Sequence, residues 1–136
     1  MSDEERWKSL TQELPPDARP VVARLHQVDV LYPPKRLADE VKGYLALVQA
    51  EARDKEWIPV QRVEALARSL IGLLKTLQRG GPDFEHRAVQ VACHYFVQEE
   101  DGDEDMESEE GFDDDVEVMN AVARELGLDD LVIDLW

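Results

Sequence analysis

The stretch DFEHRAVQVACHYFVQ, residues 83–98, predicts a helix that is apolar over more than half of its circumference. Its apolar side chains are those of Phe84, Ala88, Val89, Val91, Ala92, Cys93, Tyr95 and Phe96. Asp83, at the start of the stretch, is a residue type that caps the N-terminus of a helix. Because so wide an apolar face must be covered on several sides, we expect residues 83–98 to form the most buried helix of the protein.

The N-terminal region carries the signals of two short helices, and strand signals are almost absent from the whole chain. Ser2 and Glu5 have the spacing of a capping box, and Pro15 predicts the end of the helix that they open. A second short helix is expected between residues 16 and 32, with Pro20 early in it.

Two long amphipathic helices are expected from about residue 34 to 54 and from about residue 60 to 79, each with an apolar stripe of helical spacing. The stripes are Leu37, Val41, Tyr44, Leu45, Val48 and Ala52 in the first, and Val63, Leu66, Ala67, Leu70, Leu73, Leu74 and Leu77 in the second. A pair of glycines predicts the end of the second helix. The opposite face of that helix carries Arg68, Lys75 and Arg79 in line.

The last amphipathic helix carries Val116, Met119, Val122, Ala123 and Leu126, and Gly127 predicts its end. The chain has 136 residues, enough for one hydrophobic core, and no internal repeat. The sequence therefore predicts an all-α fold. We expect a single compact domain, residues 1–136, of five to six helices, with an acidic loop at 99–112 between the last two main helices.

An apolar and acidic tail, residues 128–136, follows the last helix. Leu131, Ile133 and Trp136 could anchor this tail to another protein, or could fold back and close the bundle. Packing on the bundle is favoured, because a monomer that exposed these side chains would leave a large apolar patch in water. Trp7 and Trp57 are expected to cover the edges of the core.

The net charge is −16 and is unevenly distributed. Residues 99–115, EEDGDEDMESEEGFDDD, hold twelve carboxylates and no basic residue, whereas the rest of the chain holds 19 acidic and 15 basic residues. This charge disfavours direct binding to nucleic acid or to an anionic membrane, and it favours a basic protein surface as partner. A local effect accounts for the negative charge of Asp113, Asp114 and Asp115, because carboxylates stabilise the N-terminus of a helix.

The nine acidic residues that precede them have no such local reason. They are Glu99, Glu100, Asp101, Asp103, Glu104, Asp105, Glu107, Glu109 and Glu110, and we interpret them as a partner-binding surface. The first two follow the C-terminus of a helix, where negative charge is unfavourable, and the row Arg68, Lys75 and Arg79 is a candidate to offset it. Dense carboxylates could also imitate nucleic-acid phosphates and inhibit a protein that binds them.

The same segment has part of the spacing of a calcium-binding loop. The candidate ligands for Ca²⁺ or Mg²⁺ are Asp101, Asp103, Asp105 and Glu107. Counted from Asp101, however, position 6 is Met106 rather than glycine, and position 12 is Phe112 rather than glutamate. A module that responds to divalent cations is therefore kept as an alternative, and no other cofactor is expected.

Between residues 86 and 126, an aromatic pair ends one helix and a turn with glycine, phenylalanine and aspartates opens the next. The residues of this frame are Tyr95, Phe96, Gly111, Phe112, Asp114 and Asp115. The frame resembles a divergent YkvA-type domain, which belongs to a bacterial helical family of uncharacterised function. The Asp-x-Ile-Pro-Asp element usual in the loop of that family is absent here. The resemblance implies a helix–loop–helix frame and no particular activity.

Catalytic residues are not indicated. His86 and Cys93 could share a helix face, but no third residue completes a zinc-like spacing. Cys93 lies in the apolar arc and is expected to be a buried, inert thiol, whereas His94 lies outside the arc and is expected at the surface. No serine lies in a nucleophile elbow, and no glycine-rich phosphate-binding motif is present.

The single cysteine excludes an internal disulfide, and the N-terminus lacks the pattern of a signal peptide. No run of apolar residues is long enough for a membrane span. We therefore expect a cytoplasmic, non-enzymatic module that binds a basic protein through its acidic surface, in a regulatory, adaptor or immunity-like role. The sequence leaves the oligomeric state open.

Overall fold

The structure, a computed structural model, describes residues 2–27, 30–77, 82–97 and 112–133. Its α-helices are α1 (Asp3–Glu13), α2 (Arg19–His26), α3 (Pro34–Ala52), α4 (Val60–Thr76), α5 (Asp83–Val97) and α7 (Asp113–Glu125), and η1 (Asp129–Leu131) is a short 3₁₀ helix. Within these ranges the structure contains no strand, and the predicted all-α bundle is confirmed. None of the described helices is long and apolar enough to cross a lipid bilayer.

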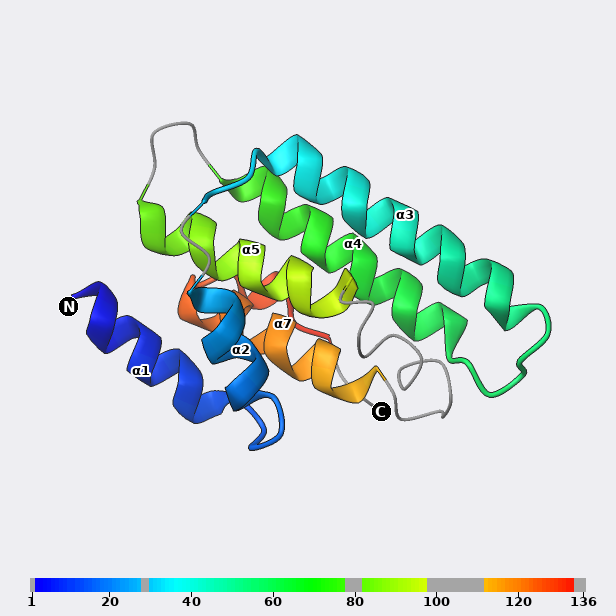
Figure 1. Ribbon diagram of the computed structural model, residues 1–136, viewed down its shortest axis with the longest axis horizontal. Helices are drawn as coiled ribbons and strands as arrows, with labels where there is room; N and C mark the ends of the chain where they lie inside the picture. Colours follow the sequence, from blue (N-terminus) through cyan, green and yellow to red (C-terminus); the bar gives the residue numbers. More distant parts are fainter. Residues whose placement is uncertain (1, 28–29, 78–81, 98–111, 134–136) are drawn as a thin grey trace.

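Helix α5 lies at the centre of the bundle (Figure 1) and packs against α2, α3, α4 and α7. The antiparallel helices α3 and α4 lie on one side of it, and α7 lies on another with α1 against it. Helix α7 is the more buried of the two inner helices, because eight of its 13 residues are buried, against eight of 15 in α5. The expectation that residues 83–98 form the most buried helix is therefore wrong. The residues that follow α7 pack against it and bury more of its surface. The spacing of apolar residues within α7 does not predict this contact.

The apolar stripes of α3 and α4 meet along the length of these two helices. Their buried members are Leu37, Val41, Tyr44, Val48, Val63, Leu66, Ala67, Leu70, Leu73 and Leu74, as the spacing predicted. These side chains join those of α5 and α7 in a single hydrophobic core. Full burial of a side chain such as leucine or valine contributes about 1.5–3 kcal/mol, so this seam supplies much of the driving force for folding.

The start of α1 follows its local signal, whereas the end of α4 does not. The Ser2 Oγ accepts a hydrogen bond of 3.2 Å from the N–H of Glu5, which confirms the predicted cap of α1. Helix α4 ends at Thr76, and the extended backbone of Leu77 follows. The prediction that this helix continues to residue 79 is therefore wrong. The Thr76 hydroxyl donates a 2.6 Å hydrogen bond to the Leu73 carbonyl, so a side chain satisfies a carbonyl at the end of this helix.

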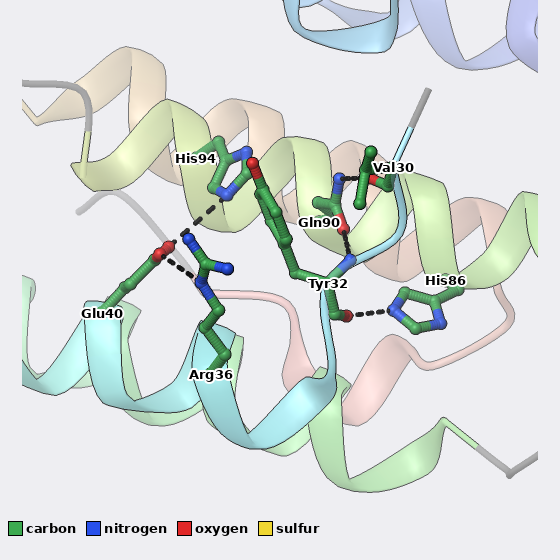
Figure 2. Close-up of polar contacts among 7 residues, drawn as sticks. All are labelled: Val30, Tyr32, Arg36, Glu40, His86, Gln90 and His94. Carbon is green, nitrogen blue, oxygen red and sulfur yellow. Dashed lines mark hydrogen bonds and ion pairs between the residues drawn. The ribbon is translucent and has the colours of Figure 1, made fainter. Parts of the chain in front are cut away.

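Gln90, a polar residue on the buried side of α5, holds the segment that connects α2 to α3 (Figure 2). Its side-chain amide accepts a 2.7 Å hydrogen bond from the N–H of Tyr32 and donates a 2.8 Å hydrogen bond to the carbonyl of Val30. Gln90 is only 2% exposed, so these bonds replace the water that its amide loses on folding. A side chain thus gives the connecting segment the two backbone hydrogen bonds that a neighbouring strand would give.

The end of α7 is a Schellman motif, as the position of Gly127 predicted. Gly127 has a φ of +73°, a left-handed conformation that glycine adopts without strain. The N–H of Leu128 donates to the carbonyl of Ala123 at 2.8 Å, and the N–H of Gly127 donates to the carbonyl of Arg124 at 3.1 Å.

The tail that follows α7 packs on the bundle as far as Ile133, which agrees with the favoured interpretation. The side-chain amide of Asn120 donates to the carbonyl of Ile133 and accepts from its N–H, both at 2.8 Å. Leu131 lies against Gly72 of α4, where a Cβ atom would lie 3.0 Å from the Leu131 Cδ2. Trp136, the third candidate anchor of the tail, lies outside the described residues.

Helix α1 is held on the bundle by Arg6 and Trp7. The guanidinium of Arg6 lies 4.0 Å from the ring centre of Phe84, and its Nη2 donates a 3.5 Å hydrogen bond to the carbonyl of Glu125 at the end of α7. The Trp7 ring meets the Phe84 ring edge-on at 5.3 Å, which confirms that Trp7 covers an edge of the core. Trp57, between α3 and α4, is 40% exposed, so the same expectation is wrong for Trp57.

Replacement of Gln90 by alanine should lower the free energy of unfolding by about 2–3 kcal/mol, because it leaves the carbonyl of Val30 and the N–H of Tyr32 without their partner. Chemical denaturation measures this change. The matched control is Gln49→Ala on the exposed side of α3, which should change stability by less than about 0.5 kcal/mol. Equal effects of the two substitutions would contradict the importance of the amide contact.

Two glycine-to-alanine substitutions should have opposite effects on stability. Gly127→Ala should destabilise the protein by about 1 kcal/mol, because alanine is strained at positive φ. Gly43→Ala, within α3, should stabilise it by about 0.5–1 kcal/mol, because a Cβ there meets no atom within 4 Å and alanine favours helix. Thermal unfolding of both variants checks the pair, and a stabilising Gly127→Ala would contradict the assignment of the helix end.

Candidate functional site

Most of the predicted site residues fall on a part of the chain that the structure leaves undescribed. The partner-binding residues Glu99, Glu100, Asp101, Asp103, Glu104, Asp105, Glu107, Glu109 and Glu110 all lie outside the described residues, and so do the four candidate cation ligands among them. Arg68 and Lys75, the proposed basic neighbours, are exposed on α4, whereas Arg79 lies outside the described ranges. Both the partner-binding surface and the cation alternative stay predictions.

The start of α7, where the acidic segment ends, carries a cluster of acidic side chains that the structure does describe. Asp113 and Asp114 lie in the first turn of α7 and Glu117 in the next, and the charge of Asp17, from the turn between α1 and α2, acts on Asp114. Burial raises the pKa of Asp114, and the negative charges of Asp17 and Asp113 raise it further. Burial also raises the pKa of Glu117, with Asp114 and Asp113 adding to the effect. We call Asp17, Asp113, Asp114 and Glu117 the acidic cluster.

The sequence predicted that the carboxylates of residues 113–115 stabilise the N-terminus of α7. The raised pKa of Asp114 shows that this prediction holds only in part. These residues do lie in the first turn of α7, but the residue at the cap position is Phe112, and α7 has no side-chain capping hydrogen bond. The positive end of a helix dipole lowers the pKa of a carboxylate. At Asp114 the burial and the like charges outweigh that effect, so this carboxylate is held in place against an electrostatic cost.

The two neighbours of Asp114 have different surroundings. Asp113 forms an ion pair with Arg62 of α4, with 3.0 Å between the Asp113 Oδ1 and the Arg62 Nη1. Asp115 points inward and is only 3% exposed. Three consecutive aspartates therefore have three environments: an ion pair, a repulsive partly exposed position and a buried position.

The described residues offer no ready metal centre. Within residues 2–27, 30–77, 82–97 and 112–133, no group of three histidine, cysteine, aspartate or glutamate side chains is placed to hold a metal ion. The acidic cluster is therefore a concentration of negative charge rather than a set of converging ligands. Such a surface attracts positive charge over a distance of roughly one Debye length, about 8 Å at physiological salt.

A second polar cluster joins α3 to α5 and includes residues that the sequence did not single out. His86, Gln90 and His94 are four residues apart along α5 and face the segment that contains Tyr32 (Figure 2). The His86 Nε2 lies 2.6 Å from the Tyr32 carbonyl, and because a carbonyl only accepts, this nitrogen carries the proton. The His94 ring meets the Tyr32 ring edge-on at 5.3 Å. Repetition of polar residues at every fourth position of an otherwise apolar helix was the sequence signal for this cluster.

His94 is not a surface residue, which corrects the prediction. Its side chain is 16% exposed, and its Nε2 lies 3.4 Å from the Glu40 Oε2 of α3. Glu40 also pairs with Arg36 at 3.5 Å, and the Arg36 guanidinium lies 4.2 Å from the ring centre of Tyr32 (Figure 2). Burial lowers the pKa of His94 and Arg36 lowers it further, while the charge and hydrogen bond of Glu40 oppose this without outweighing burial. The neutral imidazole is thus enclosed by contacts that join helices.

Cys93, the neighbour of His94, is fully buried, as predicted. Burial raises the pKa of its thiol, and the negative charge of Glu40 raises it further. A thiol in this state is not a nucleophile, because the thiolate is the reactive form.

No family model, curated protein or solved structure matches the chain. The resemblance of residues 86–126 to a YkvA-type domain stays a prediction. Within the frame that suggested it, Phe96 and Phe112 are both buried and their ring centres lie 6.4 Å apart. This contact joins the end of α5 to the start of α7.

The stability of the protein should fall on acidification through the ordinary histidine pKa of 6.5, because the unfolded chain takes up a proton that folded His94 resists. His26 should act in the same sense, since burial and Arg87 lower its pKa. The variant His94→Gln should therefore lose less stability than the wild type between about pH 7.5 and pH 5.5. Denaturation at both pH values measures the slope. An unchanged slope would contradict the assignment, whatever the absolute stability of the variant.

Proposed function

We propose that the protein is a small non-enzymatic module that binds a basic protein surface through the acidic cluster and the acidic segment that precedes it. The observation that carries this proposal is the group of neighbouring carboxylates at the start of α7. Burial raises the pKa of Asp114, with Asp17 and Asp113 adding to the effect, and burial raises the pKa of Glu117, with Asp114 and Asp113 adding to it. The fold therefore holds like charges close together on partly exposed side chains.

Such an arrangement is unfavourable for the isolated protein and favourable for a complex. Carboxylates with raised pKa values make the folded state less stable at neutral pH than it would be without them, because burial removes water from their charged forms and those charged forms repel each other. A lysine or arginine from a partner would offset that repulsion. Within the described residues, Arg62 forms an ion pair with Asp113 of the cluster. The charges of Asp114 and Glu117 are then available to basic residues of a partner.

The sequence next to α7 adds further negative charge. Nine acidic residues, at positions 99–110, directly precede Phe112 and α7. Together with the acidic cluster they make this part of the chain the main source of the net charge of −16. The expected mechanism is long-range attraction that raises the rate of association, followed by contacts that salt weakens. A regulatory or adaptor role suits this kind of binding.

The proposal is tested by calorimetric titration with a lysine-rich helical peptide over a series of salt concentrations. Wild-type protein should bind with an affinity that falls steeply as salt rises. The variant Asp114→Asn/Glu117→Gln should bind about fivefold more weakly at low salt, because two exposed charge contacts are lost.

The matched control is Asp3→Asn/Glu5→Gln, which removes the same charges from exposed positions in the first turn of α1. It should change the affinity by about twofold or less, since the neighbouring Arg6 contacts Glu125, at the end of α7 opposite the acidic cluster. Equal weakening by the two variants would mean that net charge alone attracts the peptide and would contradict a defined binding face. Absence of binding at low salt would contradict the proposal as a whole.

A further inference from the structure

The N-terminal helices α1 and α2 leave a groove between them. Helix α1 packs against α7 and α2 packs against α5, and in Figure 1 the two helices diverge from the short turn that joins them. The groove has a volume of about 480 Å³. Volumes of roughly 300–1,000 Å³ are typical of sites for small molecules.

One face of each helix lines this groove. The lining residues of α1 run from Glu4 to Gln12 and those of α2 and its cap from Arg19 to Gln27, all at spacings of three and four residues. One end of the groove, at Gln12 and Arg19, lies next to the turn between the helices. Toward the other end the rings of Trp7 and His26 meet with their centres 4.0 Å apart. The space is therefore bounded along its length by two helices.

The walls of the groove suit an apolar body. Trp7 is fixed from behind by its edge-on contact with Phe84, so its ring is a rigid wall. Val22 and Ala23 line the opposite helix, and Val22 is buried in the core. A flat aromatic or aliphatic group in the groove, against Trp7, Val22 and Ala23, would exchange water for apolar contacts.

The end of the groove near the turn is positively charged. The Arg19 Nε donates a 3.2 Å hydrogen bond to the Leu14 carbonyl, and its Nη2 donates a 3.3 Å hydrogen bond to the Gln12 carbonyl. A guanidinium has five N–H donors, so this one is positioned by two of them and can offer the other three to a ligand. Lys8 lines the groove one turn of α1 away from Gln12.

The groove lining contains one acidic residue. Glu4 lines the far end, eight residues before Gln12 and thus about 12 Å away along the helix. Glu13 and Asp17 are close to Arg19 in sequence, but both are exposed and neither is part of the lining. The fixed guanidinium of Arg19 therefore gives this end of the groove a positively charged group.

We propose that this groove binds a small amphipathic anion, with its carboxylate at Arg19 and its apolar body against Trp7, Val22 and Ala23. This function is separate from the binding of a basic partner, because none of the groove-lining residues belongs to the acidic cluster. The ligand class is set by the complementary ends of the groove: a fixed cation at one end and an aromatic wall at the other. Both aromatic and fatty acids have this chemistry.

The test compares ligands that differ in charge alone. Binding of 2-naphthoate, the neutral 2-naphthalenemethanol and the cation 2-naphthylmethylammonium is measured by chemical-shift changes in NMR spectra. The net charge of the protein favours the cation without any specific site, so saturable binding in which the carboxylate is preferred supports the proposal. A parallel titration with decanoate separates an aromatic from an aliphatic acid as the better ligand. Equal or tighter binding of the cation would overturn the proposal.

Two variants locate the site. Arg19→Gln should weaken binding of the carboxylate about tenfold, because a charge-assisted hydrogen bond is lost, and the matched control Arg24→Gln, on the exposed side of α2, should not. Ala23→Trp fills the groove from an exposed position and should abolish binding, whereas Ala46→Trp on the exposed side of α3 should not. Circular dichroism confirms that each variant is folded. Unchanged affinity in Ala23→Trp, or an equal loss in both arginine variants, would overturn the proposal.

Discussion

The contact between Gln90 and the backbone of residues 30–32 is the interaction on which the arrangement of the bundle depends. A helix at the centre of a small domain must be covered on several sides, and one cover of α5 is a connecting segment rather than a helix. Such a segment has backbone groups that would be left without hydrogen bonds against an apolar surface. Gln90 supplies them, and His86 and His94, one turn to either side, add a further hydrogen bond and a ring contact. Asn120 solves the same problem for the tail that covers α7.

Ionisable groups of the described residues occur in three different surroundings. Beside α5, Glu40 contacts both Arg36 and the largely buried His94. At the start of α7, burial and neighbouring carboxylates raise the pKa values of Asp114 and Glu117. At the turn between α1 and α2 a guanidinium is positioned by two backbone carbonyls. The first arrangement joins α3 to α5, whereas the side chains of the other two are partly or fully exposed to solvent.

Much of the fold could be predicted from the sequence, because the deciding signals are local. The apolar spacing of α3 and α4, the cap at Ser2 and the glycine at 127 depend on residues within a turn or two of each other, and all are found in the structure. The end of α4 was predicted at residue 79, because two glycines follow it at 80–81. The helix ends earlier, at Thr76, where these glycines have no local effect. His94 was misplaced for a related reason. Its cover comes from Glu40 and Tyr32, more than fifty residues away in sequence, and helical spacing carries no information about such contacts.

The candidate site was predicted less completely. Composition located the negative charge, but the repulsion among Asp17, Asp113, Asp114 and Glu117 depends on the turn after α1 approaching the start of α7. The groove between α1 and α2 had no signal at all in the sequence. It arises because each of these helices packs against a different neighbour, which is a property of the assembled bundle.

The position of Cys93 also allows the opening of the bundle to be measured by chemical labelling. It is the single thiol of the chain, it lies at the centre of α5, and it is fully buried. A thiol reagent can reach it only when the bundle opens around α5, so the rate of labelling measures how often the core opens locally. In the limit of fast closing, that rate gives the free energy of opening at one known place, without an introduced probe.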